Sequence, residues 1–126
     1  MKIIKYLNYL HEKFMLQNTY HEGRKVWYSQ TLIDASKNLP IKNMSITNKL
    51  LNTKVEWTVN TYFDIKNHLL RIKNSNLKYP IIISPKGIII DGYHRLMKSI
   101  LENKRSINYV KLDVMPPHDF LSNRKY

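Results

Sequence analysis

Cysteine is absent from the 126 residues of this chain. Without a thiol, the chain forms no disulfide, no thiolate metal site and no cysteine nucleophile. It also lacks an apolar run long enough to span a bilayer, and its first six residues lack the apolar centre of a signal peptide. We therefore expect a cytoplasmic protein without membrane contacts.

Acidic residues are scarce: 9 Asp and Glu stand against 21 Lys and Arg, which leaves a net charge of +12. A surplus of this size favours polyanionic partners, namely a nucleotide, DNA or an acidic protein. The basic residues are spread along the chain rather than gathered in one run, and the abundance of Lys and Asn is typical of AT-rich coding. The charge alone therefore does not identify a DNA-binding protein.

The length of the chain and its 43% hydrophobic content suit one domain with a real core, over residues 1–126. We expect N-terminal helices over 1–38, a core over 39–115 and a tail over 116–126. Ile3–Met15 has apolar residues at spacings of three and four, which predicts an amphipathic helix that packs on the domain or on a second copy. A second helix is expected over Gln30–Asn38, and an extended tail docked by its apolar residues.

The pattern over the core predicts strands that alternate with helices. Strands are expected over Ile41–Ile46 and Ile107–Leu112, and a hairpin over 81–83 and 88–90. Residues 48–58 look like a loop. A helix is expected from residue 58 or 60 to Asn74, and its inward residues are predicted to be Tyr62, Ile65, Leu69 and Ile72. The fold class is therefore α+β, with a small mixed β-sheet and flanking helices.

The stretch Ile88-Ile89-Ile90-Asp91-Gly92-Tyr93-His94-Arg95 carries the chemistry. Three β-branched residues predict a buried strand, Asp-Gly predicts a turn, and Leu96–Leu101 resumes at helical spacing. The first N–H groups of a helix lack internal partners and lie at the positive end of its dipole. A strand, a tight turn and a helix in this order therefore outline an anion site.

Each polar residue of the turn has a role at such a site. Gly92 would let an anion approach the backbone, and Arg95 can hold two phosphate oxygens with its planar fork. His94 can donate to a third oxygen or carry a proton near neutral pH. Asp91 is either a magnesium ligand or general base, or simply the N-cap of the helix, and the residues alone favour the cap.

A family resemblance adds to this reading. Tyr79-Pro80-Ile81-Ile82-Ile83, the turn Ser84–Gly87 and then Ile88–Leu96 resemble the core of the ParB/sulfiredoxin superfamily, over roughly Leu39 to Met115. The resemblance implies a ParB/sulfiredoxin-like fold whose turn grips nucleotide phosphates. Members range from CTP-switched DNA clamps to free-serine kinases and ATP-driven sulfinic acid reduction. The last activity needs a cysteine in the motif, where this chain has Tyr93, so it is set aside.

The resemblance also implies site residues and cofactors. Gly92, Tyr93, His94 and Arg95 would bind the phosphates of ATP, ADP or CTP, and Asp91 would bind Mg²⁺. In the free-serine kinases a glutamate in the loop before the second core helix is the base, and Glu56 lies in that loop. A surface charge explains Glu56 equally well. Trp57 would stack on a base or cover the pocket, although an aromatic beside a helix start is typical of a core.

Three classes of function follow. The first is a nucleotide-dependent phosphotransferase or NTPase whose catalytic residues are Asp91, His94 and Glu56. The second is a DNA-binding protein or nuclease of the ParB type, although the chain is short for the further regions that partition clamps carry. The third is a non-catalytic phage or mobile-element protein that binds a host partner. The base of the nucleotide, the acceptor and the oligomeric state are left open.

Overall fold

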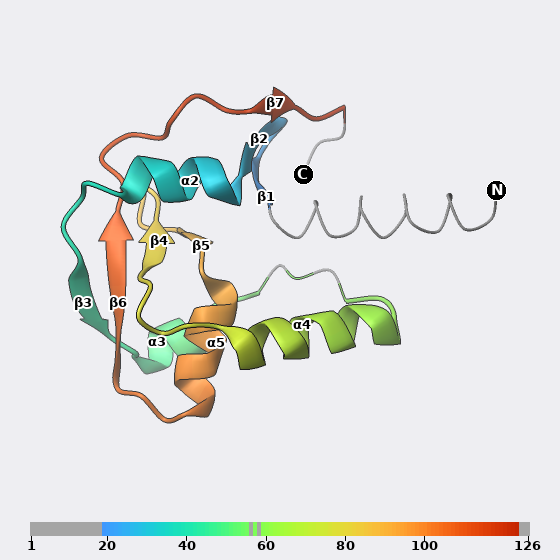
Figure 1. The fold of residues 1–126 in the computed structure, drawn as a ribbon, viewed down its shortest axis with the longest axis vertical. Helices are drawn as coiled ribbons and strands as arrows, with labels where there is room; N and C mark the ends of the chain where they lie inside the picture. The colour runs from blue at the N-terminus through green and yellow to red at the C-terminus, as the bar shows by residue number, and fades with distance from the viewer. Residues whose placement is uncertain (1–18, 56, 58, 124–126) are drawn as a thin grey trace. The chain divides into compact units, whose positions relative to one another are not determined.

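The structure is a computed structural model that describes residues 19–55, 57 and 59–123. The helix expected over Ile3–Met15 lies outside these residues, as does Glu56. The chain divides into two compact units: Met1–Lys37 with Met115–Tyr126, and Asn38–Val114. Figure 1 traces both units by residue number. Whether they form one domain, as the composition suggests, stays a prediction.

The first unit is built on a three-stranded antiparallel sheet in the order β1-β2-β7. A hairpin with Gly23 in its turn joins β1 (Thr19–Glu22) to β2 (Lys25–Tyr28), and β2 also pairs with β7 (Phe120–Leu121). The helix α2 (Ser29–Ser36) follows β2 directly. Sequence patterning predicted the helix and the docked tail, but not the β1–β2 hairpin.

Long-range hydrogen bonds fix the C-terminal segment to this unit. The indole N–H of Trp27, a buried residue, donates to the carbonyl of Pro116 at 2.8 Å. The carboxylate of Asp119 accepts from the backbone N–H of Tyr28 at 2.8 Å and from the Thr31 hydroxyl at 2.9 Å. Because α2 has no side-chain cap of its own, Asp119 satisfies its start from the other end of the chain.

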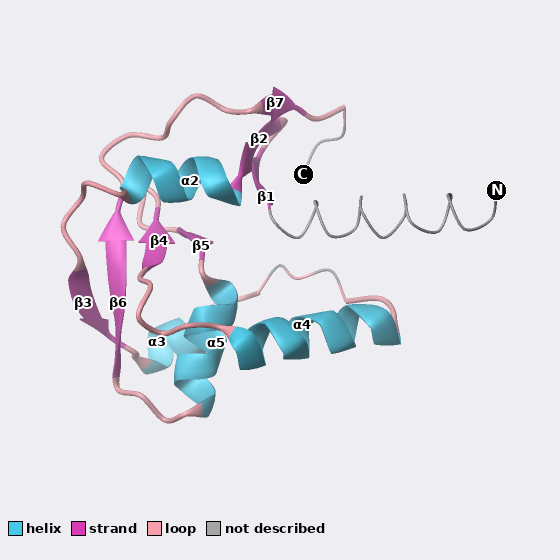
Figure 2. Cartoon of the chain, in the orientation of Figure 1, coloured by secondary structure: helices cyan, strands magenta, loops and turns pink. Residues whose placement is uncertain are grey.

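The second unit is a four-stranded mixed sheet in the order β3-β6-β4-β5. Figure 2 shows its strands and helices by type. Its strands are β3 (Lys42–Ser45), β4 (Ile81–Ile83), β5 (Ile89–Asp91) and β6 (Ser106–Lys111). Its helices are α3 (Asn48–Leu51), α4 (Tyr62–Asn74) and α5 (Tyr93–Leu101). The β4–β5 and β3–β6 pairs are antiparallel, and β4 runs parallel to β6.

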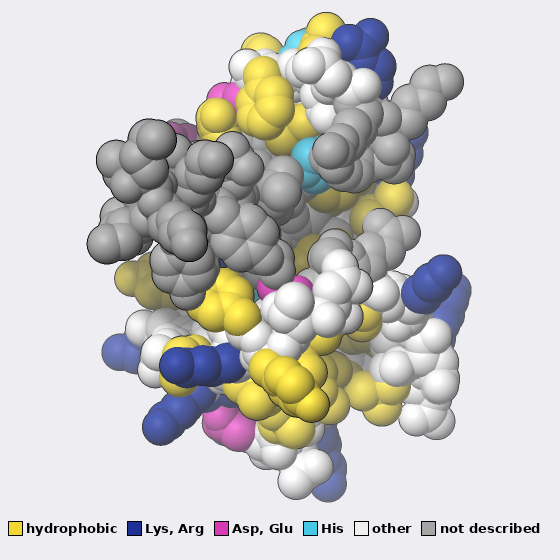
Figure 3. All heavy atoms as spheres, turned by 90° about the vertical axis from the view of Figure 1, so that its right-hand side faces the viewer, with side chains coloured by type: hydrophobic (Ala, Val, Ile, Leu, Met, Phe, Trp, Pro, Cys, Tyr) yellow, Lys and Arg dark blue, Asp and Glu magenta, His cyan; other side chains and the backbone are white. Residues whose placement is uncertain are grey.

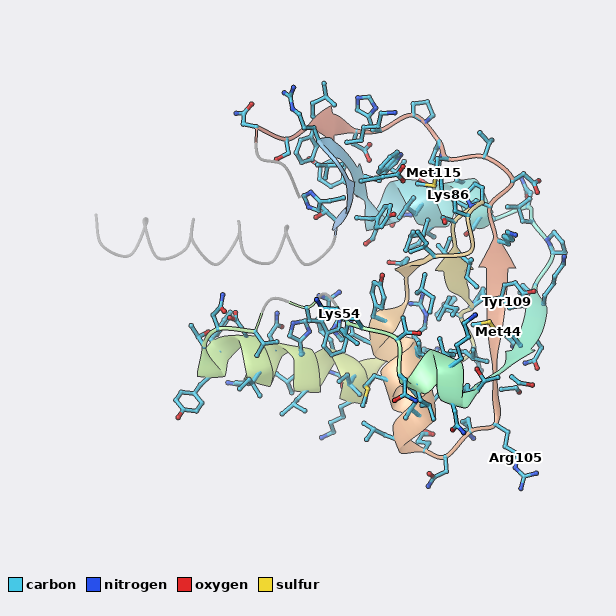
Figure 4. All side chains as sticks on the ribbon, turned by 180° about the vertical axis from the view of Figure 1, so that it is seen from behind. Met44, Lys54, Lys86, Arg105, Tyr109 and Met115 are labelled. Carbon is cyan, nitrogen blue, oxygen red and sulfur yellow. The ribbon has the colours of Figure 1, made fainter. Side chains whose placement is uncertain are left out.

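The core of this unit lies between the sheet and α5. Ile81 and Ile83 of the central strand β4 pack with Leu96 of α5 and Ile107 of β6, all at least 90% buried. Partly buried Met44, on β3, and Tyr109, on β6, pack against this cluster and are labelled in Figure 4. Three isoleucines in a row at β4 are explained by its central position, where both faces of the strand are covered.

The small α+β fold is therefore confirmed, with the predicted hairpin and the predicted strands around it. The short helix α3 lies in the segment that was predicted to be a loop. In the described residues, none of the helices has the length and apolar character needed to cross a membrane.

The predicted inward face of α4 is largely wrong. Ile72 is buried, but Tyr62 is 91% exposed, Leu69 59% and Ile65 44%. The buried positions of this helix are instead Asp64, His68 and Ile72, so two of its three buried residues are polar. Apolar side chains lie at the surface among Lys and Arg in the lower half of Figure 3. The polar side is inward because its groups find partners there, as described next.

Candidate functional site

The strand-turn-helix corner forms as the motif predicts, with one change in the role of Asp91. Asp91 ends β5, Gly92 is the N-cap, and α5 begins at Tyr93. The first helical hydrogen bond runs from the Leu96 N–H to the Gly92 carbonyl at 3.0 Å. Asp91 is therefore not the helix cap that the residues alone favoured, because the chain turns through the left-handed conformation of Gly92, at φ +99°.

Gly92 is required by space as well as by conformation. A Cβ at this position would lie 2.7 Å from Ile81 Cγ2 and 2.9 Å from Arg95 Nη2. The side of Gly92 where a side chain would stand is thus filled by protein atoms. The glycine lets β4 and the Arg95 guanidinium pack close to the turn, a purpose different from the predicted close approach of an anion.

The Arg95 guanidinium is held inside the protein through one nitrogen. Nη2 donates to Asp91 Oδ2 and to the carbonyl of Pro80, both at 3.1 Å. The two charged side chains are largely shielded, with 21% of Arg95 and 15% of Asp91 exposed. Nε is buried without a hydrogen-bond partner in the described residues. Any phosphate contact of Arg95 therefore falls to Nη1, or requires the Asp91 ion pair to open.

His94 pairs with a second histidine, His68 of α4. The distance from His94 Nε2 to His68 Nδ1 is 2.8 Å. The ring centroids are 5.1 Å apart and the ring planes differ by only 19°. A nitrogen–nitrogen distance this short at this centroid separation means that the two imidazoles meet edge to edge. One nitrogen of each ring then lies between the two ring centres. One ring donates and the other accepts, so the pair shares a single N–H in this contact.

Trp57 covers both imidazoles. Its ring centroid lies 4.5 Å from that of His68 and 4.9 Å from that of His94, at interplanar angles of 13° and 14°. One indole face therefore spans the hydrogen-bonded pair and keeps water from that side of it. Trp57 therefore stacks on side chains of α4 and α5, and its predicted role in stacking on a base or covering a pocket stays a prediction.

The electrostatics keep His94 uncharged at neutral pH. Burial, reinforced by the charges of Arg71, His68 and Arg95, lowers the pKa of His94 from 6.5 to about 4. Burial also lowers the pKa of Arg71, and the nearby Asp91 carboxylate partly offsets this. Arg71 thus lies within electrostatic reach of both His94 and Asp91, so α4 and α5 each bring an arginine and a histidine to this corner.

The start of α5 is a possible place for an anion. Its N-cap is a glycine, which supplies no side-chain acceptor, and its first turn contains no acidic residue. The N–H groups of Tyr93, His94 and Arg95 precede the first helical hydrogen bond and have no partner within the helix. The Tyr93 hydroxyl is engaged elsewhere, because it donates to the carbonyl of Ile89. Tyr93 can therefore contribute to a ligand site through its backbone more readily than through its hydroxyl.

Four of the predicted site residues, Asp91, Gly92, His94 and Arg95, do lie together at one corner. Glu56 and Thr58 lie outside the described residues, so the predicted role of Glu56 is neither supported nor opposed. From the sequence, His68 was expected to face solvent or to cap the polar side of its helix, and its buried position was missed. Arg71, with Lys66 and Lys73, was a candidate for phosphate or acidic-surface contact. The signal was present: Asp64, His68 and Arg71 recur at spacings of four and three, which puts three polar residues on one helix face.

Metal-binding groups are few here. Within residues 19–55, 57 and 59–123, no three His, Asp or Glu side chains are placed to share a metal ion. Searches against protein-family models, curated proteins and solved structures return no match for this chain. The resemblance to the ParB/sulfiredoxin superfamily therefore stays a prediction that depends on the motif alone.

Proposed function

We propose that the Asn38–Val114 unit binds a nucleotide, holds its phosphates at the start of α5, and acts as an NTP-dependent phosphotransferase or NTPase in the cytoplasm. The observation that carries the proposal is that two histidines, two arginines and one carboxylate gather beside the start of α5. His68 and Arg71 come from α4, and His94 and Arg95 from α5. The carboxylate is Asp91.

Charge balance is the first support. Among the described residues, the guanidinium groups of Arg71 and Arg95 both lie within electrostatic reach of the Asp91 carboxylate and the neutral His94, which offers an anion two cationic partners at this corner. The start of α5 adds the positive end of the helix dipole. A ligand with several negative charges, such as a di- or triphosphate, gains more from this field than a neutral ligand does.

The Asp91–Arg95 pair suits a phosphate ligand in two ways. It holds the guanidinium beside the helix start in the empty protein, which reduces the side-chain entropy lost on binding. It also leaves Asp91 Oδ1 without a hydrogen bond to the described part of the protein, since Oδ2 is the atom that accepts from Arg95. Mg²⁺ is commonly bound by one carboxylate oxygen, with phosphate and water oxygens filling the rest of its coordination shell. The ion would also neutralise charge on the phosphates.

Calorimetry and thermal unfolding with ATP, ADP and CTP, each with and without Mg²⁺, test the proposal. A ligand at one hundred times its Kd stabilises the folded state by about 2.7 kcal/mol. Arg71→Ala should weaken binding at least tenfold without removing the Asp91–Arg95 pair. Arg105→Ala removes the same charge from an exposed turn, where Figure 4 shows its side chain pointing away from the unit, and should bind as the wild type does.

Arg95→Lys is the second variant, because it keeps the charge while removing the planar fork. The proposal would be contradicted if none of the three nucleotides bound the wild type. It would also be contradicted if Arg71→Ala and Arg105→Ala lost nucleotide affinity equally. Turnover is then measured as phosphate release with the nucleotide that binds. The DNA-binding and host-partner classes stay predictions, because no feature of the described residues favours one of them specifically.

A further inference from the structure

We propose that His68 is a positioning residue that fixes the proton of His94 on Nδ1, so that a neutral imidazole donates a hydrogen bond to the bound phosphate. This inference rests on the proposed function. It adds a residue from a different helix, which touches His94 and has no contact of its own with the ligand.

The hydrogen bond between the two rings decides where the protons are. His94 Nε2 and His68 Nδ1 are 2.8 Å apart, and only one of them carries the shared hydrogen. If His68 donates, Nε2 of His94 is the acceptor and its single proton is on Nδ1. If His94 donates, its Nδ1 presents a lone pair, which repels an oxyanion.

The contact with His68 occupies Nε2 of His94, so Nδ1 is the ring nitrogen left for a ligand. In the proposed site this Nδ1–H donates to a phosphate held at the first turn of α5, the helix that carries His94. The imidazole and the backbone can donate to the same phosphate group only in this tautomer.

The surroundings keep His94 neutral and cover one face of the contact. Arg71 of α4 and Arg95 of α5 oppose a further proton on His94, while Asp91 of β5 is engaged by Arg95. Trp57 lies over both imidazoles and limits water that would compete for Nε2. A fixed neutral donor avoids the loss of binding that a charged histidine would suffer between pH 6 and 8.

Two substitutions separate the hydrogen bond from the ring stacking. His68→Asn keeps an N–H donor near the position of Nδ1 but removes the ring under Trp57. His68→Phe keeps a ring for Trp57 but removes the donor. If His68 has only a structural role, His68→Phe should keep more of the wild-type nucleotide affinity than His68→Asn. If His68 positions the proton of His94, His68→Asn should keep more.

The direct readout is the long-range ¹H–¹⁵N spectrum of the imidazoles at pH 7, which identifies the protonated nitrogen and also shows whether each variant is folded. In the wild type and in His68→Asn we expect His94 with its proton on Nδ1. In His68→Phe we expect the other tautomer or a mixture. A proton on Nε2 of His94 in the wild type would overturn the inference, and so would an unchanged tautomer in His68→Phe.

ATP and CTP titrations complete the test. The donor to a charged oxygen is worth about tenfold in affinity, so His68→Phe should bind about tenfold more weakly and His68→Asn within about threefold of the wild type. Equal losses in both variants would reject the positioning role while leaving the proposed function intact. If no nucleotide binds the wild type, the proposed function fails, and the spectra still report which nitrogen carries the proton.

Discussion

The starts of α4 and α5 are built in opposite ways. At α4 the Thr61 hydroxyl accepts from the Asp64 N–H at 3.2 Å, and the Asp64 carboxylate accepts from the N–H groups of Asn60 and Thr61 at 2.9 and 3.1 Å. At α5 the cap is a glycine, which has no side chain to accept from the first turn. One helix start is thus capped by its own side chains, whereas the cap residue of the other, beside the paired arginine, contributes none.

The largest expected effect comes from Gly92→Ala, which alters the start of α5. The new Cβ would meet β4 and the Arg95 guanidinium at 3.0 Å or less, in a left-handed backbone. We expect a loss of about 3 kcal/mol or more in the free energy of unfolding, measured in urea. Gly87→Ala is the control, since its φ is also positive but nothing lies within 4 Å, and it should lose about 1 kcal/mol. Equal losses would show that packing at Gly92 is unimportant.

Asp64→Ala removes the cap of α4. Because the carboxylate is fully buried and accepts two backbone N–H groups, we expect a loss of about 2 kcal/mol, again from urea unfolding. Asp64→Asn keeps one acceptor oxygen and should lose less. If the alanine variant were as stable as the wild type, the capping bonds would contribute nothing to α4, and the contrast between the two helices would have no energetic meaning.

Acid should destabilise the protein through His94. Its pKa is near 4 in the folded chain and 6.5 otherwise, so between these values the unfolded chain binds a proton that the folded chain does not. Stability therefore falls as pH drops from 6.5 towards 4, by about 1 to 3 kcal/mol after allowance for partial exposure. Urea unfolding at pH 7 and 4.5 measures the slope. His94→Gln should flatten it, and an unchanged slope would refute the assignment.

The smallest effect is expected on the outer face of α4. Leu69→Lys should change the free energy of unfolding by no more than about 0.5 kcal/mol, because this side chain is 59% exposed. Ile72→Ala, at a buried position of the same helix, should cost about 2 kcal/mol or more. A large loss of unfolding free energy in Leu69→Lys would indicate that Leu69 lies on the buried face of α4, as the sequence pattern suggested.

The elements of the core were predictable because their signals are local. The isoleucine runs of β4 and β5, the turn before Ile88 and the Asp-Gly step specify a hairpin followed by a helix with little help from the rest of the chain. The corner that gathers Asp91, Gly92, His94 and Arg95 follows from that hairpin. Its residues were therefore found from eight consecutive positions.

The partners of these residues were not predictable, because they come from far along the chain. His68 is 26 residues from His94, and its inward position depends on the imidazole that it meets there. Apolar periodicity assigned Tyr62, Ile65 and Leu69 to the inside of α4, but a helix with a polar buried side reverses that rule. The β1–β2 hairpin was missed because its four-residue strands alternate too briefly to be distinguished from a loop.

The chain has two tryptophans, and each compact unit contains one. Trp57 is stacked on two imidazoles, whereas Trp27 packs edge-on to His118 and donates to Pro116. Single-tryptophan proteins made by Trp27→Phe and Trp57→Phe would therefore give each unit its own fluorescence signal. Emission changes during refolding would then reveal whether the two units form together or one after the other, without any added dye.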